Sequence, residues 1–283
     1  MATIIYHHIG DGSSPFINRL DITTSADEFK KQLEHFAKTK VEITFDDGYS
    51  SAFEVALPLL QEFQIPATFY LNLAALTSGT SWLNKLSYLI NTLSDGHWAQ
   101  FSRDAGVAAP ARNVYPFWKF FDYPKTLEAI EKWYSGPATT LFMDRKQILE
   151  LASDPLFKVG SHSRNHWPLH RIPRELIHDE VVAHHHDLEK YLGIKPSGFS
   201  IPFGLREDAT DNVIKCASQI DDCLRTSFGG KAFSNPLLPE KQRIGISDWA
   251  RLGTLLSAPK LETFRERTLP FGGGLRPLKG GSQ

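Results

Sequence analysis

Two short segments, far apart in the chain, carry the side chains best suited to chemistry. One is residues 44–48, Thr-Phe-Asp-Asp-Gly, and the other is residues 161–166, Ser-His-Ser-Arg-Asn-His. Together they supply two carboxylates and two imidazoles, which can hold a divalent metal ion and activate a water molecule on it. If the two segments meet in space, the chemistry they predict is metal-assisted hydrolysis.

The first segment can divide two roles between adjacent acids. Residues 41–45 have the pattern of a buried strand, and in a regular strand Asp46 and Asp47 would point to opposite faces. At the end of a strand the backbone can turn, and Gly48 permits the conformations that such a turn needs. One carboxylate can then bind the metal while the other lies beside the metal-bound water as a base. The alternative is an Asp-Gly turn with two solvated acids.

The second segment favours the metal site over the solvated turn. His162 and His166 are four residues apart and follow a strand predicted at residues 157–161. A short helical turn would place both imidazoles within reach of one ion. One carboxylate and two imidazoles leave coordination positions open, which is typical of a catalytic ion. We expect one divalent ion, with zinc as the first choice and cobalt, nickel or iron as alternatives.

Strand and helix patterns alternate along the chain, and this alternation must position the two segments. It predicts an α/β fold built on a parallel sheet or barrel, with the chemistry at the carboxyl ends of the strands. The predicted strands are residues 3–6, 41–45, 67–71, 157–161, 197–201, 222–226 and 242–246. The predicted helices include residues 25–37, opened by a capping box, a helix after Gly48 that Pro58 kinks or shortens, 173–192 and 207–218.

Residues from about 75 to 142 interrupt the alternation. Apolar side chains at helical spacing come first, and a cluster of aromatic residues follows between Tyr115 and Tyr134. We interpret this stretch as a helical, aromatic-rich insertion packed on the sheet or barrel. Its rings form either an apolar lid with its own small core, or a surface where one or two rings stack on a sugar face.

Composition excludes several classes of function. A chain of 283 residues with 41% apolar residues fits one large domain or two small ones, and we expect a single domain at residues 1–270, followed by a flexible tail at 271–283. The formal net charge of −1 does not indicate binding of nucleic acid, and no apolar run is long enough to cross a membrane. The N-terminus lacks the pattern of a secretory signal, and Cys216 and Cys223 are expected to be reduced thiols, so we expect a cytoplasmic protein.

The motifs resemble those of the polysaccharide deacetylases, the NodB-homology family or carbohydrate esterase family 4. Residues 44–48 and 162–166 resemble its first two motifs, and residues 198–204, Gly-Phe-Ser-Ile-Pro-Phe-Gly, resemble its third. Tyr6-His7-His8 and residues 242–244, Gln-Arg-Ile, resemble the branch that contains exopolysaccharide deacetylases. The resemblance covers roughly residues 4–246. It implies a distorted (β/α) barrel with fewer regular strands than a TIM barrel.

The resemblance also implies a role for each motif residue. Asp46 would be the catalytic base, and the backbone N–H of Phe203, which follows Pro202, would hold the oxyanion together with the metal. The metal ligands would be Asp47, His162 and His166.

The implied reaction removes an N-acetyl group from an amino sugar in a polysaccharide, or in a lipid- or nucleotide-linked precursor, during surface-polysaccharide biosynthesis. The expected partner is therefore an N-acylated amino sugar or glycan. An N-deformylase or another amide hydrolase would use the same machinery. A catalytically degenerate glycan-binding protein is the alternative from another class. A two-histidine, one-carboxylate iron oxygenase shares the ligand count, but its fold should not alternate strands with helices.

Two departures from the family pattern concern the base and the general acid. Many members have an arginine where this chain has Ser200, and Arg243 could supply the missing guanidinium or be an ordinary surface residue. Many members also carry a late histidine that protonates the leaving amine, but no histidine follows His186.

The missing acid must therefore come from elsewhere in the chain. Asp46 could return the proton it took, or His8 or His170 could act. We favour His8, because it closes the first strand, and its neighbour His7 should point the other way. The run of histidines at residues 184–186 fans out over about 200° of a helix and cannot chelate one ion, so we interpret it as a partly solvated helix face.

Overall fold

The computed structural model describes residues 2–38, 41–108, 112–220, 224–226, 241–242 and 244–245. Arg243, Cys223 and the predicted tail at 271–283 lie outside the described residues. No helix in the described part of the chain is both long and apolar enough to cross a membrane.

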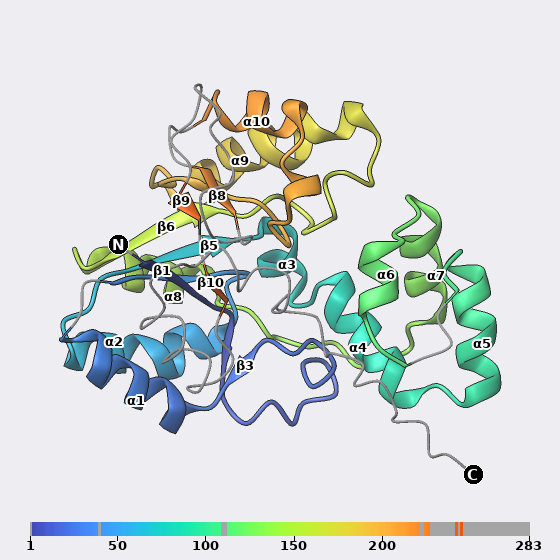
Figure 1. The fold of residues 1–283 in the computed structure, drawn as a ribbon, viewed down its shortest axis with the longest axis horizontal. Coiled ribbons are helices and arrows are strands. Elements are labelled where there is room, and N and C mark those ends of the chain that lie inside the picture. The colour runs from blue at the N-terminus through green and yellow to red at the C-terminus, as the bar shows by residue number, and fades with distance from the viewer. Residues whose placement is uncertain are drawn as a thin grey trace, which may run out of the picture.

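A curled parallel sheet forms the centre of the molecule (Figure 1). The strands are β1 (Ala2–Tyr6), β2 (His8–Ile9), β3 (Thr23–Thr24), β4 (Val41–Phe45), β5 (Ala67–Leu71), β6 (Phe157–Ser161), β7 (Phe199–Ser200), β8 (Leu224–Thr226), β9 (Lys241–Gln242) and β10 (Ile244–Gly245). Among the described residues the main sheet has eight strands in the order β10-β1-β4-β5-β6-β7-β8-β9, and its neighbours pair in parallel. β2 and β3 form a separate parallel pair.

The strand predictions are accurate in the middle of the sheet and less so at its edges. β4, β5 and β6 have the predicted bounds, whereas β7 is shorter than the predicted 197–201. The predicted strand 242–246 is replaced by two short strands: β9 pairs with β8, and β10 pairs with β1. One short stretch of chain therefore pairs with both edges of the curled sheet, and the distorted (β/α) barrel is confirmed.

Helices flank the sheet, with α1 and α2 below it and α9 and α10 above it in Figure 1. The α-helices are α1 (Ala26–Phe36), α2 (Leu57–Glu62), α3 (Leu73–Ser78), α4 (Trp82–Thr92), α5 (Asp95–Asp104), α6 (Tyr115–Lys119), α7 (Lys125–Trp133), α8 (Arg145–Ser153), α9 (His184–Leu192) and α10 (Asp211–Ala217). The other helical turns are η1 (Ala52–Ala56), η2 (Arg174–Leu176), η3 (Asp179–Ala183) and η4 (Arg206–Asp208), of which η1 and η3 are π-helical.

Two helix predictions show how single residues set these boundaries. Pro58 lies in the first turn of α2, where its missing N–H costs nothing, and the π-helical η1 precedes it. The predicted helix 173–192 consists of η2, η3 and α9 in succession, and it ends where Gly193 adopts a left-handed conformation (φ 76°).

A stack of aromatic rings fixes the strands that lead to the motif residues. Phe45 of β4 stacks on Phe69 of β5, with ring centroids 5.0 Å apart and planes at 10°, and it lies 5.5 Å from Tyr6 of β1. Phe29 of α1 contacts Phe45 edge-on at 5.8 Å. Burying each such ring contributes about 1.5–3 kcal/mol. The end of β4, directly before Asp46, is therefore held on both sides.

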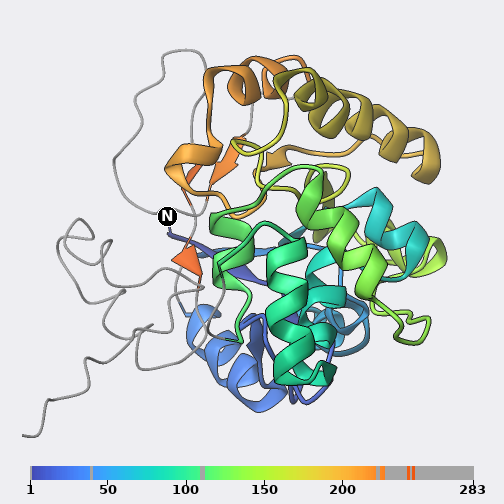
Figure 2. The ribbon, with the colours of Figure 1, turned by 90° about the vertical axis from the view of Figure 1, so that its right-hand side faces the viewer.

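The insertion forms a helical layer of α4–α7 at one end of the sheet, and Figure 2 turns this layer toward the viewer. Phe101 and Phe117 stack at 5.3 Å, and Trp98 packs against both. All three rings are buried. These rings belong to one apolar cluster that also contains residues of the barrel, Phe199 and Ile201 among them, so the insertion packs on the barrel through a shared core and not a core of its own. Among the large hydrophobic side chains described, Phe120 is exposed, at 52%.

Candidate metal centre

The register of the sheet brings the motif segments to one edge. Phe45 pairs with Phe69, Leu71 pairs with Ser161, and Ser161 pairs in turn with Phe199. Because all these strands run in parallel, the residues that follow them in the chain lie next to one another. The ends of β4, β6 and β7 thus meet at the carboxyl edge of the sheet, as the sequence predicts.

A tight turn after β4 points both acids toward the same place. Asp47 has a φ of 71° and Gly48 a φ of 83°, so the chain leaves the regular strand at once. The N–H of Asp46 still donates to the Tyr6 carbonyl at 2.9 Å, which keeps this residue in line with the sheet. His162 Nε2 lies 3.6 Å from both Asp46 Oδ2 and Asp47 Oδ1.

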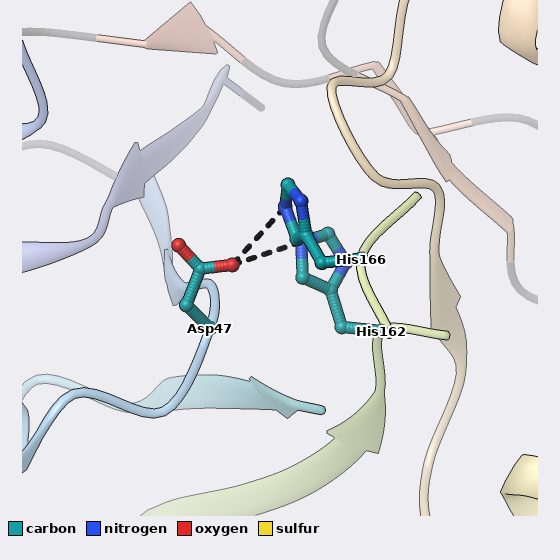
Figure 3. Close-up of side chains that lie close together, drawn as sticks. All are labelled: Asp47, His162 and His166. Atoms are coloured by element: carbon teal, nitrogen blue, oxygen red, sulfur yellow. Dashed lines mark ion pairs between the residues drawn. The ribbon is translucent and has the colours of Figure 1, made fainter. Parts of the chain in front are cut away.

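Three side chains converge on one point, as Figure 3 shows. Asp47 Oδ1 lies 3.2 Å from His166 Nε2 and 3.6 Å from His162 Nε2, and the three candidate ligand atoms lie within 4.8 Å of one another. Their residues are 8%, 6% and 1% exposed, in the order in which they are named here. The three residues expected to bind a metal are therefore the ones that the fold brings together.

The spacing of these atoms fits a metal ion. Ligand bonds of about 2.0–2.1 Å in a tetrahedral zinc site place neighbouring ligand atoms about 3.3 Å apart, close to the observed 3.2 and 3.6 Å. Asp47 Oδ1 is buried without a hydrogen bond of normal geometry among the described residues, and it faces imidazole nitrogens. A buried carboxylate oxygen in this position needs a cation, so the donor set suits a divalent metal.

The orientation of His162 is set from behind. Its Nδ1 lies 2.7 Å from the carbonyl oxygen of Ser200, so Nδ1–H donates to that carbonyl. The lone pair of Nε2 is then directed at the acids, which is the arrangement that a metal-binding imidazole requires.

The loop that carries His166 is irregular, and the predicted helical turn is wrong. Ser163 and His166 both adopt positive φ, at 60° and 57°, and the N–H of His166 donates to Ser163 Oγ at 3.1 Å. The amide of Asn72, at the end of β5, donates to the carbonyls of His162 and Ser163. The two imidazoles therefore meet through a tight loop closed by side chains, which helical spacing does not describe.

Buried Glu180 holds the middle of this loop. The sequence analysis did not identify it as a residue of the site. Its carboxylate accepts from the N–H of Asn165 at 3.0 Å and from the Asn165 side-chain amide at 2.5 Å, while its carbonyl accepts from the N–H of Arg164. Burial raises the pKa of Glu180, although the hydrogen bonds from Asn165 oppose it. A lone glutamate in a helix gave no signal that distinguished it from a solvated residue.

The pKa values show how strongly the acid and the imidazoles interact. Burial acts to raise the pKa of Asp47, but His166, His7 and His162 outweigh it and hold this pKa below its usual range. Burial acts to lower the pKa of His166, but the adjacent Asp47 carboxylate outweighs it, so that pKa is raised. Asp47 is therefore ionised near neutral pH, as an anionic ligand must be.

The third motif packs against the cluster. Phe203 has a φ of 58°, and its ring contacts the ring of His166 edge-on at 4.8 Å. The carbonyl of Pro202 accepts from the N–H of Gly204 at 2.6 Å, which closes a tight turn. This turn places the predicted oxyanion-binding residues, Pro202 and Phe203, beside a predicted ligand. The role of the Phe203 N–H stays a prediction.

Ser200 contacts the predicted base directly. Its Oγ donates to Asp46 Oδ2 at 3.2 Å. The sequence analysis considered only that Ser200 stands where many family members have an arginine, and assigned no contact to it. Arg243, proposed there as the replacement, lies outside the described residues. The signal for this contact was present in the third motif, because Ser200 ends the strand beside β6.

The histidines proposed as general acids have other contacts. His8 Nδ1 lies 3.2 Å from Thr23 Oγ1, and burial lowers the pKa of His8 although Asp11 opposes the shift. His170 Nδ1 lies 2.7 Å from a carboxylate oxygen of buried Asp208. It is the charge of His7, set aside in the sequence, that acts on the carboxyl of Asp47. The role of His8 as the acid stays a prediction.

The predicted solvated face at residues 184–186 is wrong for two of its three histidines. His184 and His185 are 0% and 1% exposed, because this turn of α9 packs against β5 and β6. His184 Nε2 lies 3.1 Å from the Leu71 carbonyl, and His185 Nδ1 lies 3.0 Å from Ser161 Oγ. Both imidazoles therefore support the ends of the strands that carry the motif residues. His186 alone of the three is exposed.

A parallel α/β barrel with a buried carboxylate–imidazole cluster at its strand ends is the class of protein that fold and site define. The chain belongs to the polysaccharide deacetylase family, whose model matches residues 34–219. No curated protein matches the sequence.

Solved structures agree with this fold. The deacetylase PplD from Streptococcus pyogenes, in complex with acetate, has a TM-score of 0.57 at 16% identity, over 87% of this chain and 92% of that chain. IcaB from Ammonifex degensii has a TM-score of 0.57 at 16% identity, over 91% and 97%. The BpsB deacetylase domain from Bordetella bronchiseptica has a TM-score of 0.51 at 14% identity, over 87% and 95%. At these identities the likeness shows the fold alone.

Proposed function

We propose that this protein is a metal-dependent hydrolase that removes the N-acetyl group from an amino sugar of a glycan or of its precursor. The observation that carries the proposal is the buried cluster of Asp47, His162 and His166, with Asp46 3.6 Å from His162 Nε2. Membership of the polysaccharide deacetylase family supports hydrolysis of the amide of an acetylated sugar, and the likeness to a deacetylase solved in complex with acetate supports the acetyl group.

Each residue of the site has a definite task in this reaction. Asp47, His162 and His166 hold the ion, with zinc, cobalt, nickel and iron all fitting the donor set. When bound, the ion supplies Lewis-acid activation of water and of the amide carbonyl. The hydroxyl of Ser200 orients the carboxylate of Asp46. Asp46 takes a proton from the attacking water.

The remaining steps concern the carbonyl oxygen and the leaving amine. The N–H of Phe203 donates to the carbonyl oxygen as negative charge develops on it. The leaving nitrogen then takes up a proton, either returned by Asp46 or given by His8, and the products are acetate and a free amino sugar.

The substitution Asp46→Asn separates metal binding from turnover. Asn keeps the shape of the side chain but removes the base, so we expect metal content by elemental analysis to stay at one ion per chain. Acetate release from acetylated amino-sugar oligomers should fall by about 10²–10⁴-fold. Formylated substrates, assayed in parallel for formate, distinguish a deacetylase from a deformylase.

His166→Ala tests the metal site, with His186→Ala as its control because His186 is exposed. We expect metal and activity to be lost in the first variant and retained in the second. Absence of metal from the wild type after reloading with zinc, cobalt or nickel would refute the site, and glycan binding without turnover would then be the better interpretation. Full activity of Asp46→Asn would exclude Asp46 as the base.

A further inference from the structure

The first turn of α4 joins the two motif loops that carry the proposed metal ligands. We propose that Trp82 and Asn84, both in this turn, are positioning residues for the metal centre, so that the insertion is part of the frame of the active site. The inference rests on the proposed function, because it concerns the same three ligands.

Trp82 holds the loop of His166. Its indole Nε1–H donates to the carbonyl of His166 at 3.0 Å, and both residues are buried. His166 has a positive φ of 57°, a conformation that is strained for a residue with a side chain. A buried carbonyl must also find a donor. The indole supplies that donor and so favours the one backbone conformation that directs the imidazole at Asp47.

Asn84 holds the other loop. Its Nδ2 donates to Tyr49 Oη and to the Phe16 carbonyl, both at 3.0 Å, and its Oδ1 accepts from the N–H of Ser81 at 3.1 Å. Tyr49 follows Gly48 directly in the chain. The hydrogen bond to the Tyr49 hydroxyl therefore anchors the chain directly after the turn that carries Asp47.

The turn itself is rigid. Ser81 is the N-cap of α4, and it forms a capping box with Asn84 in which each side chain bonds the backbone of the other. Such caps stabilise the start of a helix because they satisfy backbone N–H groups that have no partner within the helix. Because Trp82 and Asn84 both lie in this turn, a shift of the turn would move the loop after β4 and the loop after β6 together.

A second helix of the insertion reaches the third motif. Trp118 of α6 stacks on Phe203 with centroids 5.4 Å apart and planes at 17°, and Trp82 lies 6.4 Å from the same ring. Phe203 in turn contacts the ring of His166. The insertion thus touches the second and third motif segments, and Tyr49 directly after the first, through buried side chains. An appended lid would have no need for hydrogen bonds to two of the three.

The test uses Trp82→Phe, which removes the N–H donor and keeps an aromatic ring. Trp133→Phe is the matched control, because Trp133 Nε1–H also donates a hydrogen bond, to Asp104 Oδ2 at 2.9 Å, within the insertion. The probe is Co²⁺ titrated into metal-free protein, read by its visible absorption, which reports both affinity and coordination geometry. Circular dichroism confirms that each variant is folded.

We expect Trp82→Phe to weaken Co²⁺ binding by about 10-fold or more and to change the shape of the visible absorption bands. Loss of a group that is hydrogen-bonded to a metal-binding residue typically lowers metal affinity by at least this factor. Trp133→Phe should leave both unchanged. Tyr49→Phe, which removes the hydroxyl that Asn84 holds, should weaken binding by a smaller factor. If Trp82→Phe does not fold, the Co²⁺ affinity of Tyr49→Phe tests the inference in its place.

The possible failures are distinguishable. Wild-type affinity and spectrum in both Trp82→Phe and Tyr49→Phe would overturn this inference and leave the metal site intact. Equal weakening by Trp133→Phe would also overturn it, because the effect would then be general loosening of the insertion. A wild-type protein that binds no Co²⁺ would refute the proposed metal site and this inference with it.

Discussion

The neutral hydroxyl of Ser200 donates a hydrogen bond to Asp46, where the family resemblance leads one to expect an arginine. The two solutions differ physically. A guanidinium would fix the carboxylate and also stabilise its negative charge, whereas a hydroxyl fixes its direction with a much smaller electrostatic effect. In the described part of this site, the proposed base is therefore oriented by a hydrogen bond from the end of β7, three strands away from β4 in the sheet.

Ser200→Ala should lower turnover without removing the metal. A hydrogen bond to a charged group contributes about 1.5–3 kcal/mol, so we expect kcat to fall roughly 10- to 100-fold, with metal content unchanged. Steady-state rates and elemental analysis on the same preparation check this result.

The control for this substitution is Ser102→Ala. Ser102 is also buried, but its hydroxyl makes no hydrogen bond among the described residues, so its loss should leave the rate and stability near wild type. A wild-type rate for Ser200→Ala would mean that the contact does not orient Asp46 in the reaction.

At this scale the sequence analysis identified the candidate ligands and the proposed base, and missed the side chains that hold them. Asp47, His162 and His166 belong to compact motifs in which residue type and spacing are visible. Their supports join distant parts of the chain: Ser200 and Asp46 are 154 residues apart, and Trp82 and His166 are 84 apart. No local pattern reports such a pair, because only the fold decides which strand ends and helix starts become neighbours.

The element that places His162 is β6, and its packing depends on a glycine. Gly160 pairs with Tyr70 of β5, and the Tyr70 ring lies across the position that a side chain at Gly160 would fill. A Cβ there would lie 2.4 Å from the ring and 2.8 Å from the carbonyl of Ser197. A glycine inside a strand often marks such a close approach.

Gly160→Ala should therefore destabilise the protein. The added methyl must displace the Tyr70 ring or part the strands, and overpacking of this kind costs about 1–3 kcal/mol. Urea unfolding measures the loss. The control is Gly96→Ala in α5, where a Cβ would meet nothing within 4 Å and stability should be unchanged or slightly raised. Equal stability of the two variants would show that β5 and β6 tolerate separation.

Elements were predicted best where a single pattern dominates. Strands β4, β5 and β6 are mostly buried and have apolar residues at alternate positions, and their bounds match those predicted from the sequence. The histidines of α9 were misjudged because three consecutive polar residues suggest exposure, whereas this helix lies over two strand ends and buries two of them. The π-helical turn directly before α9 has no distinguishing sequence pattern.

Across the whole molecule, buried titratable groups act in opposite directions on stability. Burial raises the pKa of Glu180 and of Asp208, so the folded state holds these protons more tightly. Their contribution is present at low pH and is lost as pH rises through the folded pKa. Burial lowers the pKa of His184 to about 3, although its contact with the Leu71 carbonyl opposes the shift. The contribution of His184 to stability therefore changes with pH in the opposite direction to that of the two acids.

The sign for His184 follows from proton binding. Between pH 6.5 and about 3 the unfolded chain binds a proton at this imidazole and the folded chain does not, so stability falls as pH falls through 6.5. The loss amounts to about 2 kcal/mol at pH 5 relative to pH 8. Because the two buried acids act in the opposite sense, only a comparison of variants isolates this effect.

His184→Gln removes the titration and keeps an amide N–H that can reach the Leu71 carbonyl. Urea unfolding of metal-free protein at pH 8 and pH 5 should show the wild type losing about 2 kcal/mol more than the variant over this interval. His186→Gln is the control, since His186 directly follows the buried pair in the chain and is exposed. This variant should keep the wild-type dependence of stability on pH. If His184→Gln also keeps that dependence, His184 is protonated in the folded state, and the packing of α9 over the ends of β5 and β6 is looser than its burial indicates.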